Sequence, residues 1–152
     1  VLVETPYDGA DTTGRVRSVV LPNGKRFSWF VDPHFHPTRL VDIAFTGLPE
    51  QVVAGDTLRL TLRISNPYPY AIGVCGDRSL VMLWKHGRFR VEEFDTGEHF
   101  NIPAGDTITR EVRFVVPEQL SGAGFDAGFA LRRDGYTNWF NGKPLRTEVV
   151  AP

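Results

Sequence analysis

The chain has a single cysteine, Cys75, in 152 residues, so it can form no internal disulfide bond. A small secreted scaffold held together by disulfides is therefore excluded. Cys75 stands between Val74 and Gly76, and no histidine lies close to it in the sequence. We interpret it as a small buried hydrophobic residue, because a catalytic thiol needs a neighbouring base.

An excess of charge of one sign and a long hydrophobic run are also missing. Seventeen Lys and Arg residues stand against eighteen Asp and Glu residues, which leaves a formal net charge of -1 at pH 7. Surfaces that bind nucleic acid or anionic membranes need clustered basic residues, so neither partner is expected. No apolar run is long enough to span a bilayer, which predicts no membrane insertion. The first residues do not resemble a signal peptide, and we interpret the chain as a mature secreted protein or a piece of a larger one.

The periodicity of an amphipathic helix is absent as well, and alternation takes its place. The tetrapeptide Ala-Gly-Asp-Thr occurs at residues 54–57 and again at residues 104–107. Each copy precedes a run in which apolar residues occupy every second position, namely Leu58, Leu60, Leu62 and Ile64 after the first and Val112, Phe114 and Val116 after the second. A turn that leads into a half-buried strand is typical of antiparallel β proteins.

Turn residues divide the rest of the chain into short strands. Asn23-Gly24 predicts a tight hairpin between residues 15–21 and 25–31. Residues 80–84 are apolar on both faces, which indicates a central strand that is covered on both sides. About nine strands in one domain of residues 1–152, with residues 1–14 as an irregular lead-in, predict an all-β sandwich or barrel.

The arginines give two different signals. Arg59 and Arg63, like Arg88 and Arg90, occupy alternate positions, which is typical of the solvated face of a sheet. Arg110, in contrast, is in register with the inward-facing residues of its strand. A bulge would move its side chain outward, or it is a buried charge with a partner, and the sequence leaves both open.

Aromatic residues in loops are the main candidates for ligand binding. Large rings in a loop either pack inward or meet a ligand, and flat rings can stack on the apolar face of a sugar. Neighbouring asparagines can hydrogen-bond sugar hydroxyls. The predicted ligand-binding residues are Tyr68, Tyr70, Tyr136, Asn138, Trp139 and Asn141. Trp29 and Trp84 lie in predicted strands and are expected in the core.

His34 and His36 are the candidates for metal binding. Two histidines at positions i and i+2 of a strand point to the same face, as in metal sites on β scaffolds. Together with residues 102–106, they resemble the two motifs of the cupin family, but the Glu after the second His and the His after the Pro-x-Gly turn are absent. Asp8 and Asp11 could supply oxygens to a structural calcium, although EF-hand spacing is missing. The acidic residues between Glu92 and Glu98 are interpreted as a solvated strand end rather than as a hydrolase pair.

The order of turns and strand ends from Val53 to Leu131 carries a second resemblance. Ala54-Gly55-Asp56 precedes a long strand ending in Asn66-Pro67, and a hairpin, Ala104-Gly105-Asp106 and Val115-Val116-Pro117 follow. This pattern resembles immunoglobulin-like accessory domains of bacterial secreted proteins. It is similar to modules of carbohydrate-active enzymes, to sugar-binding domains of polysaccharide exporters and to the intracellular proteinase inhibitor family of bacilli. In the inhibitor family a Trp-containing motif follows the hairpin, and Phe94-Asp95-Thr96-Gly97 does not reproduce it.

The resemblance implies an antiparallel immunoglobulin-like β-sandwich of two sheets. It also implies a non-catalytic accessory module of a larger secreted or cell-surface protein, with a glycan or another protein domain as partner. We therefore expect a carbohydrate-binding domain without a cofactor and, on balance, not an enzyme. A protein-interaction or spacer domain without a small ligand, and a cupin-like metal-dependent enzyme, are the alternatives. The same sandwich hosts many functions, so the site has to decide among them.

Overall fold

The computed structural model describes residues 2–4, 15–31, 38, 40–76, 78–133 and 139–152. The chain divides into two compact units, residues 1–39 and residues 40–152, and each is described by itself. In the described residues the secondary structure consists of thirteen strands and a single 3-10 turn, η1 (Glu118–Leu120). The prediction of an all-β fold is therefore confirmed, whereas the prediction of a single domain stays a prediction.

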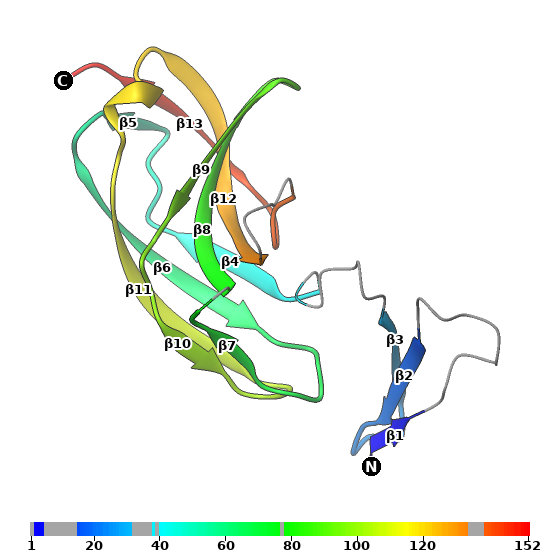
Figure 1. Cartoon of the computed structure of the whole chain (residues 1–152). Coiled ribbons are helices and arrows are strands. Elements are labelled where there is room, and N and C mark those ends of the chain that lie inside the picture. Colours follow the sequence, from blue (N-terminus) through cyan, green and yellow to red (C-terminus); the bar gives the residue numbers. More distant parts are fainter. Residues whose placement is uncertain (1, 5–14, 32–37, 39, 77, 134–138) are drawn as a thin grey trace. The chain divides into compact units, whose positions relative to one another are not determined.

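The first unit contains one antiparallel sheet with the order β1-β2-β3 (Figure 1). Strands β2 (Arg15–Val20) and β3 (Arg26–Val31) form the predicted hairpin, in which the Gly24 N–H donates to the Leu21 carbonyl at 2.9 Å. Strand β1 (Leu2–Glu4) pairs with β2. Residues 2–4 are thus a strand and not part of an irregular lead-in, because β2 offers a free edge to pair with; three residues are too few to show alternation in the sequence.

The second unit contains ten strands in three sheets. The first sheet comprises β11 (Thr107–Val115), β6 (Thr57–Ser65) and β4 (Asp42–Thr46). The second comprises β5 (Gln51–Val53), β13 (Leu145–Val150), β12 (Ala123–Arg133), β8 (Arg78–His86) and β9 (Arg90–Asp95). The third is the pair β10 (Phe100–Ile102) and β7 (Ile72–Val74). Within these sheets only β5 and β13 pair in parallel. The prediction of two sheets is wrong for the described residues, because the short strands β7 and β10 pair only with each other.

The two Ala-Gly-Asp-Thr turns lie at opposite ends of the β6–β11 pair. Nine residues of each strand are paired, from Thr57 with Val115 to Ser65 with Thr107. Each turn holds the end of the other strand through its aspartate: the Val116 N–H donates to the Asp56 carbonyl at 2.9 Å. The Asn66 N–H likewise donates to the Asp106 carbonyl at 2.8 Å. The repeated tetrapeptide therefore has the same structural role at both ends of the longest ladder.

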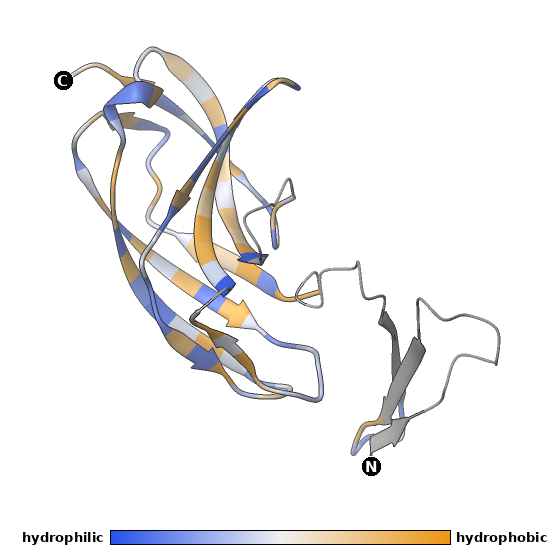
Figure 2. Ribbon diagram, viewed as in Figure 1, coloured by the Kyte–Doolittle hydropathy of each residue, from blue (hydrophilic) through white to orange (hydrophobic). Residues whose placement is uncertain are grey.

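The three-stranded and five-stranded sheets face each other across one apolar core. Alternation along β6 buries Leu58, Leu60, Leu62 and Ile64, and Figure 2 shows the corresponding alternation of hydrophobic and hydrophilic residues along the strands. Rings from the two sheets meet between the layers: Phe45 of β4 and Phe129 of β12 have centroids 5.1 Å apart. Trp84 of β8 and Phe114 of β11 are 6.2 Å apart. The second unit is thus sandwich-like.

Strand β8 is buried on both faces, as its continuous apolar run predicted. Leu80, Met82 and Trp84 alternate with Val81 and Leu83, and all are 0% exposed. The outer set, Val81 and Leu83 with Ala130 of β12, packs against Phe140 of the β12–β13 connection. Phe140 therefore covers part of the outer face of the five-stranded sheet.

The structure decides the two interpretations of Arg110 and corrects that of Cys75. The β6–β11 ladder contains no bulge, so Arg110 keeps its inward register. Its guanidinium lies 4.5 Å from the centroid of the Phe100 ring and 3.4 Å from the Glu98 carboxylate. Arg110 is thus a half-buried charge with a partner.

Cys75 is exposed rather than buried, because Ile72 and Val74 occupy the inward positions of β7 and Cys75 follows at the strand end.

Candidate functional site

The loop after β6 presents one exposed aromatic ring on top of a buried one. Tyr70 is 38% exposed, whereas Tyr68 is only 2% exposed. Their rings are stacked, with centroids 5.2 Å apart and an angle of 20° between the planes. Of the two possibilities for a ring in a loop, Tyr68 thus packs inward, and it supports Tyr70 from beneath. Tyr70 is therefore the member of the pair that is partly exposed.

Asn66 fixes the shape of this loop. Its side-chain amide donates to the carbonyls of Tyr70 at 2.9 Å and Pro103 at 3.2 Å, and its side-chain oxygen accepts from the Tyr68 N–H at 3.0 Å. The Gly105 N–H also donates to the Tyr68 carbonyl at 2.9 Å. The second Ala-Gly-Asp-Thr turn and the tyrosine loop are thus bonded to one another. A ring held this way loses little conformational entropy when a ligand binds.

Burial and neighbouring groups change the acidity of both tyrosines. Burial raises the pKa of Tyr70 to about 12, with a further increase from Tyr68 and a smaller decrease from the nearby Arg78 guanidinium. Burial also raises the pKa of Tyr68, and the hydrogen bond from the Leu40 backbone partly offsets this increase. Both hydroxyls therefore stay protonated at neutral pH, so the Tyr70 hydroxyl can donate a hydrogen bond to a ligand oxygen.

Asn141, another predicted ligand-binding residue, is a buried part of the framework. It is 1% exposed, and its side-chain oxygen accepts from the Leu131 N–H at 2.9 Å. Its side-chain amide donates to the Val41 carbonyl at 3.0 Å, and its own carbonyl accepts from the Ile43 N–H at 2.8 Å. These bonds join β12 to β4 across the two layers. A group engaged in this way is not accessible to a ligand.

Two other predicted residues, Tyr136 and Asn138, lie outside the described residues, and Trp139 is half-buried. Trp139 directly precedes Phe140, whose ring lies 4.9 Å beneath the Lys85 ammonium nitrogen. The structure nevertheless links the two aromatic loops. The Tyr68 hydroxyl accepts from the Leu40 N–H, while Asn141 binds Val41, so both predicted loops contact the same short segment before β4. Leu40 itself is 49% exposed next to this contact.

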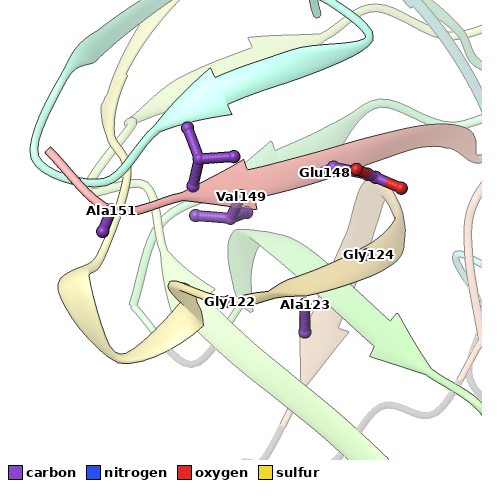
Figure 3. A pocket seen from close by; sticks show the side chains of 7 residues that line it. Gly122, Ala123, Gly124, Glu148, Val149 and Ala151 are labelled. Atoms are coloured by element: carbon purple, nitrogen blue, oxygen red, sulfur yellow. The ribbon is translucent and has the colours of Figure 1, made fainter.

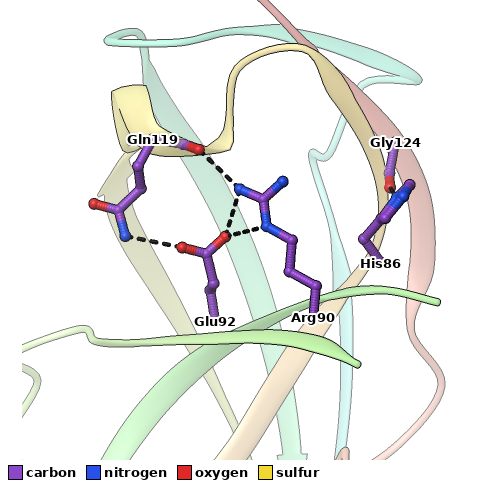
Figure 4. A network of polar contacts seen from close by, with 5 residues as sticks. All are labelled: His86, Arg90, Glu92, Gln119 and Gly124. Carbon is purple, nitrogen blue, oxygen red and sulfur yellow. Dashed lines mark hydrogen bonds and ion pairs between the residues drawn. The ribbon is translucent and has the colours of Figure 1, made fainter. Parts of the chain in front are cut away.

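The three glutamates near β9 are individually paired with cations, whereas the Asp95 carboxylate accepts from the Gly97 N–H at 2.8 Å. Glu92 accepts from Arg90 and from Gln119 at 2.8 and 2.9 Å, as Figure 4 shows, and Arg90 also donates to the Gln119 carbonyl. Glu93 is paired with Arg132 and Glu98 with Arg110. These contacts fit the interpretation of the acidic stretch as a solvated strand end.

The β8–β9 hairpin ends in the most exposed large apolar residue of the described part of the chain. Phe89 is 98% exposed, and Arg88 beside it is exposed as well. The base of the hairpin is held firmly: the His86 ring bonds the Gly124 carbonyl at 2.7 Å (Figure 4), and the Arg90 guanidinium lies over the Phe125 ring. The hairpin is therefore anchored at its base and exposes Phe89 at its tip. Phe89 was missed in the sequence because the alternation of Arg88 and Arg90 indicated a strand at this position.

An open groove of about 360 Å³ runs between the beginning of β12 and the end of β13 (Figure 3). It is lined by Gly122, Ala123, Gly124 and residues 148–151. Glu148 is the one ionisable residue of this lining, and no aromatic ring contributes to it. The groove therefore lacks the flat ring on which a sugar could stack, and it contains none of the predicted site residues.

The predicted metal ligands His34 and His36, like Asp8 and Asp11, lie outside the described residues. Within the described ranges, no group of three or more His, Cys, Asp or Glu side chains is arranged to hold a metal ion. In the same part of the chain, no helix has the length and apolar character needed to cross a membrane. No known protein-family model matches the chain. The search of curated proteins likewise found no match.

Proposed function

We propose that the second unit is an immunoglobulin-like module that binds a glycan without catalysing a reaction on it. The observation that carries this proposal is the stacked pair Tyr68–Tyr70, in which the partly exposed Tyr70 rests on the buried Tyr68. A sugar can place its apolar face on such a ring while its hydroxyls bond nearby polar groups. The Tyr70 hydroxyl and the Arg78 guanidinium beside it supply those groups.

Trp139 stays a predicted ligand-binding residue, as do Tyr136 and Asn138, which lie outside the described residues. Tyr68 supports Tyr70 rather than touching the ligand, and Asn141 is assigned to the framework because it is buried. By resemblance to bacterial accessory domains, we propose that the module serves a larger extracellular or cell-surface protein.

The test is calorimetric titration of the whole chain with a panel of neutral and acidic polysaccharides. We expect at least one to bind, and Tyr70→Ala to weaken that binding about tenfold, the equivalent of about 1.4 kcal/mol. Tyr70→Phe keeps the ring and should retain most of the affinity. Phe89→Ala is the matched control, because it removes an exposed ring elsewhere. Equal affinities of the wild type and the Tyr70→Ala variant would contradict the proposed platform.

A second candidate function, protein interaction, is favoured by Phe89. A ring that is 98% exposed beside an exposed arginine resembles the aromatic and arginine anchors that dominate protein interfaces. If this function is the principal one, the wild type binds no polysaccharide of the panel. A partner isolated with the immobilised chain would then lose its affinity for the Phe89→Ala variant and keep it for Tyr70→Ala.

A further inference from the structure

The outer face of the β6–β11 pair sets two arginines directly opposite each other. Arg59 of β6 and Arg113 of β11 are partners in the strand register, so their Cβ atoms lie on one face about 5 Å apart. Both residues are exposed. Neither guanidinium takes part in an ion pair within the described ranges. Like charges in this arrangement repel one another and destabilise the sheet.

The surrounding residues compensate this repulsion only in part. The next row of the same face contains Thr61 and Glu111, and the row after it contains Arg63 and Thr109. Three guanidinium groups therefore share the Glu111 carboxylate with Asp42 of β4, which is paired with Ser65 in the row next to Arg63. This leaves a local excess of one positive charge, and Asp42 lies three rows away from Arg59. The chain as a whole has a net charge of -1, so the excess is a local feature.

The chemistry of the pair indicates an oxyanion ligand. Guanidinium groups bind carboxylate and sulfate groups through two parallel hydrogen bonds, and two opposed arginines can hold one oxyanion between them. The site is a flat face rather than an enclosed pocket. The neighbouring outward-facing residues of β6 and β11 are exposed too, so they form no walls around the arginine pair. A single free anion gains little on such an open face. A chain of repeated acidic groups gains more, because successive groups rebind at high effective concentration.

We infer that Arg59 and Arg113 form a binding site for the carboxylate or sulfate groups of an acidic glycan. Thr57 and Thr61, which flank Arg59 on the same face, provide hydroxyls for the sugar oxygens. The site lies on the outer face of β6 and β11 and does not depend on the Tyr70 platform. The variants Arg59→Gln and Arg113→Gln test this site, whereas Tyr70→Ala tests the Tyr70 platform, so the two proposals can fail independently.

The experiment measures binding of the whole chain to polygalacturonate, dextran sulfate, neutral dextran, polyglutamate and inorganic sulfate. We expect binding to at least one of the two acidic glycans that weakens as salt is added, and no binding to neutral dextran on this face. Arg59→Gln and Arg113→Gln should each weaken binding to the acidic glycan about tenfold, because each removes one of the two guanidinium groups that hold the oxyanion. Arg88→Gln is the matched control, since Arg88 is an exposed arginine on another element.

A measurement of stability separates binding from folding. Removing one charge of a repelling pair should leave the free energy of unfolding of Arg59→Gln equal to that of the wild type or raise it. Loss of binding together with lower stability would overturn the inference, as would equal losses in Arg59→Gln and Arg88→Gln. Polyglutamate binding more tightly than both acidic glycans would assign the face to an acidic protein instead. If inorganic sulfate saturated the site at the same concentration as the glycan, the arginine pair would be a simple anion site and the inference of a glycan site would be overturned.

Discussion

The Tyr68 hydroxyl and the Asn141 side-chain amide hold two consecutive residues of one backbone segment. Tyr68 accepts from the Leu40 N–H at 3.2 Å, and Asn141 donates to the Val41 carbonyl at 3.0 Å. Both side chains were predicted to meet a ligand, and both instead fix the entry into β4. In the tyrosine loop, Tyr70 is the partly exposed residue, and the same framework holds this loop in place.

Replacement of Asn141 should test its structural role. In Asn141→Ala the Leu131 N–H and the Val41 carbonyl lose their partners in a buried site, so we expect a loss of about 2–4 kcal/mol in the free energy of unfolding. Denaturant unfolding measures this change. Asn101→Ala, at an exposed position, is the control and should change stability by less than about 0.5 kcal/mol. Similar values for the two variants would show that Asn141 contributes nothing special.

Replacement of Asn66 should loosen the tyrosine loop without touching a ligand. Asn66→Ala removes the acceptor of the Tyr68 N–H and the donor to the Tyr70 carbonyl, and it should cost about 1–3 kcal/mol of stability. We expect faster hydrogen exchange of the Tyr68 amide and weaker glycan binding. If the Tyr68 amide exchanges as slowly as in the wild type, the loop is held by other contacts.

The raised pKa of Tyr70 predicts a loss of stability at high pH. Its pKa in the folded chain is about 12, compared with 10.0 for an ordinary tyrosine, so folding favours the protonated form. The corresponding stability is fully present below about pH 10 and is lost as the pH rises toward 12. Phenolate absorbance should show Tyr70 titrating near pH 12. Tyr70→Phe should reduce the slope of stability against pH in this range, and an unchanged slope would assign the effect to other groups, including Tyr68.

Gly142 should tolerate no side chain, in contrast to Gly105. Both have positive φ values, +115° and +66°, so alanine at either costs about 1–2 kcal/mol. At Gly142 an added Cβ would also collide with the Ile43 carbonyl oxygen, whereas at Gly105 no atom lies within 4 Å. We expect Gly142→Ala to cost about 1–3 kcal/mol more than Gly105→Ala. Thermal unfolding of the two variants compares them, and equal melting temperatures would contradict the close approach.

The sequence predicted the elements whose pattern is local. Alternation gave β6 and β11 nearly to the residue, Asn23-Gly24 gave the first hairpin, and the apolar run of β8 gave its burial on both faces. The segments it missed, β1 and β5, have three residues each and are strands only because a neighbouring strand binds them. So short a segment shows no period of its own.

The candidate site was harder to predict because exposure depends on distant residues. Tyr68 between two prolines has the sequence of an exposed loop, yet its partner Leu40 is 28 residues away. Asn141 contacts Val41, 100 residues away. Likewise, no single-strand pattern shows that Arg113 stands opposite Arg59, since this follows only from the register of the two strands.

The two Ala-Gly-Asp-Thr turns, at Asp56 and Asp106, help to fix the register in which β6 pairs with β11. In each turn the aspartate carbonyl accepts from the backbone N–H of the residue that follows the opposite strand. A shift of the pairing by one residue would therefore break both bonds at once and turn every leucine of β6 toward water. Slippage is thus penalised at both ends of the ladder. The outward-facing side chains of these strands are consequently held at fixed spacings. Fixed spacing of this kind is what the recognition of a regularly repeating polymer would need.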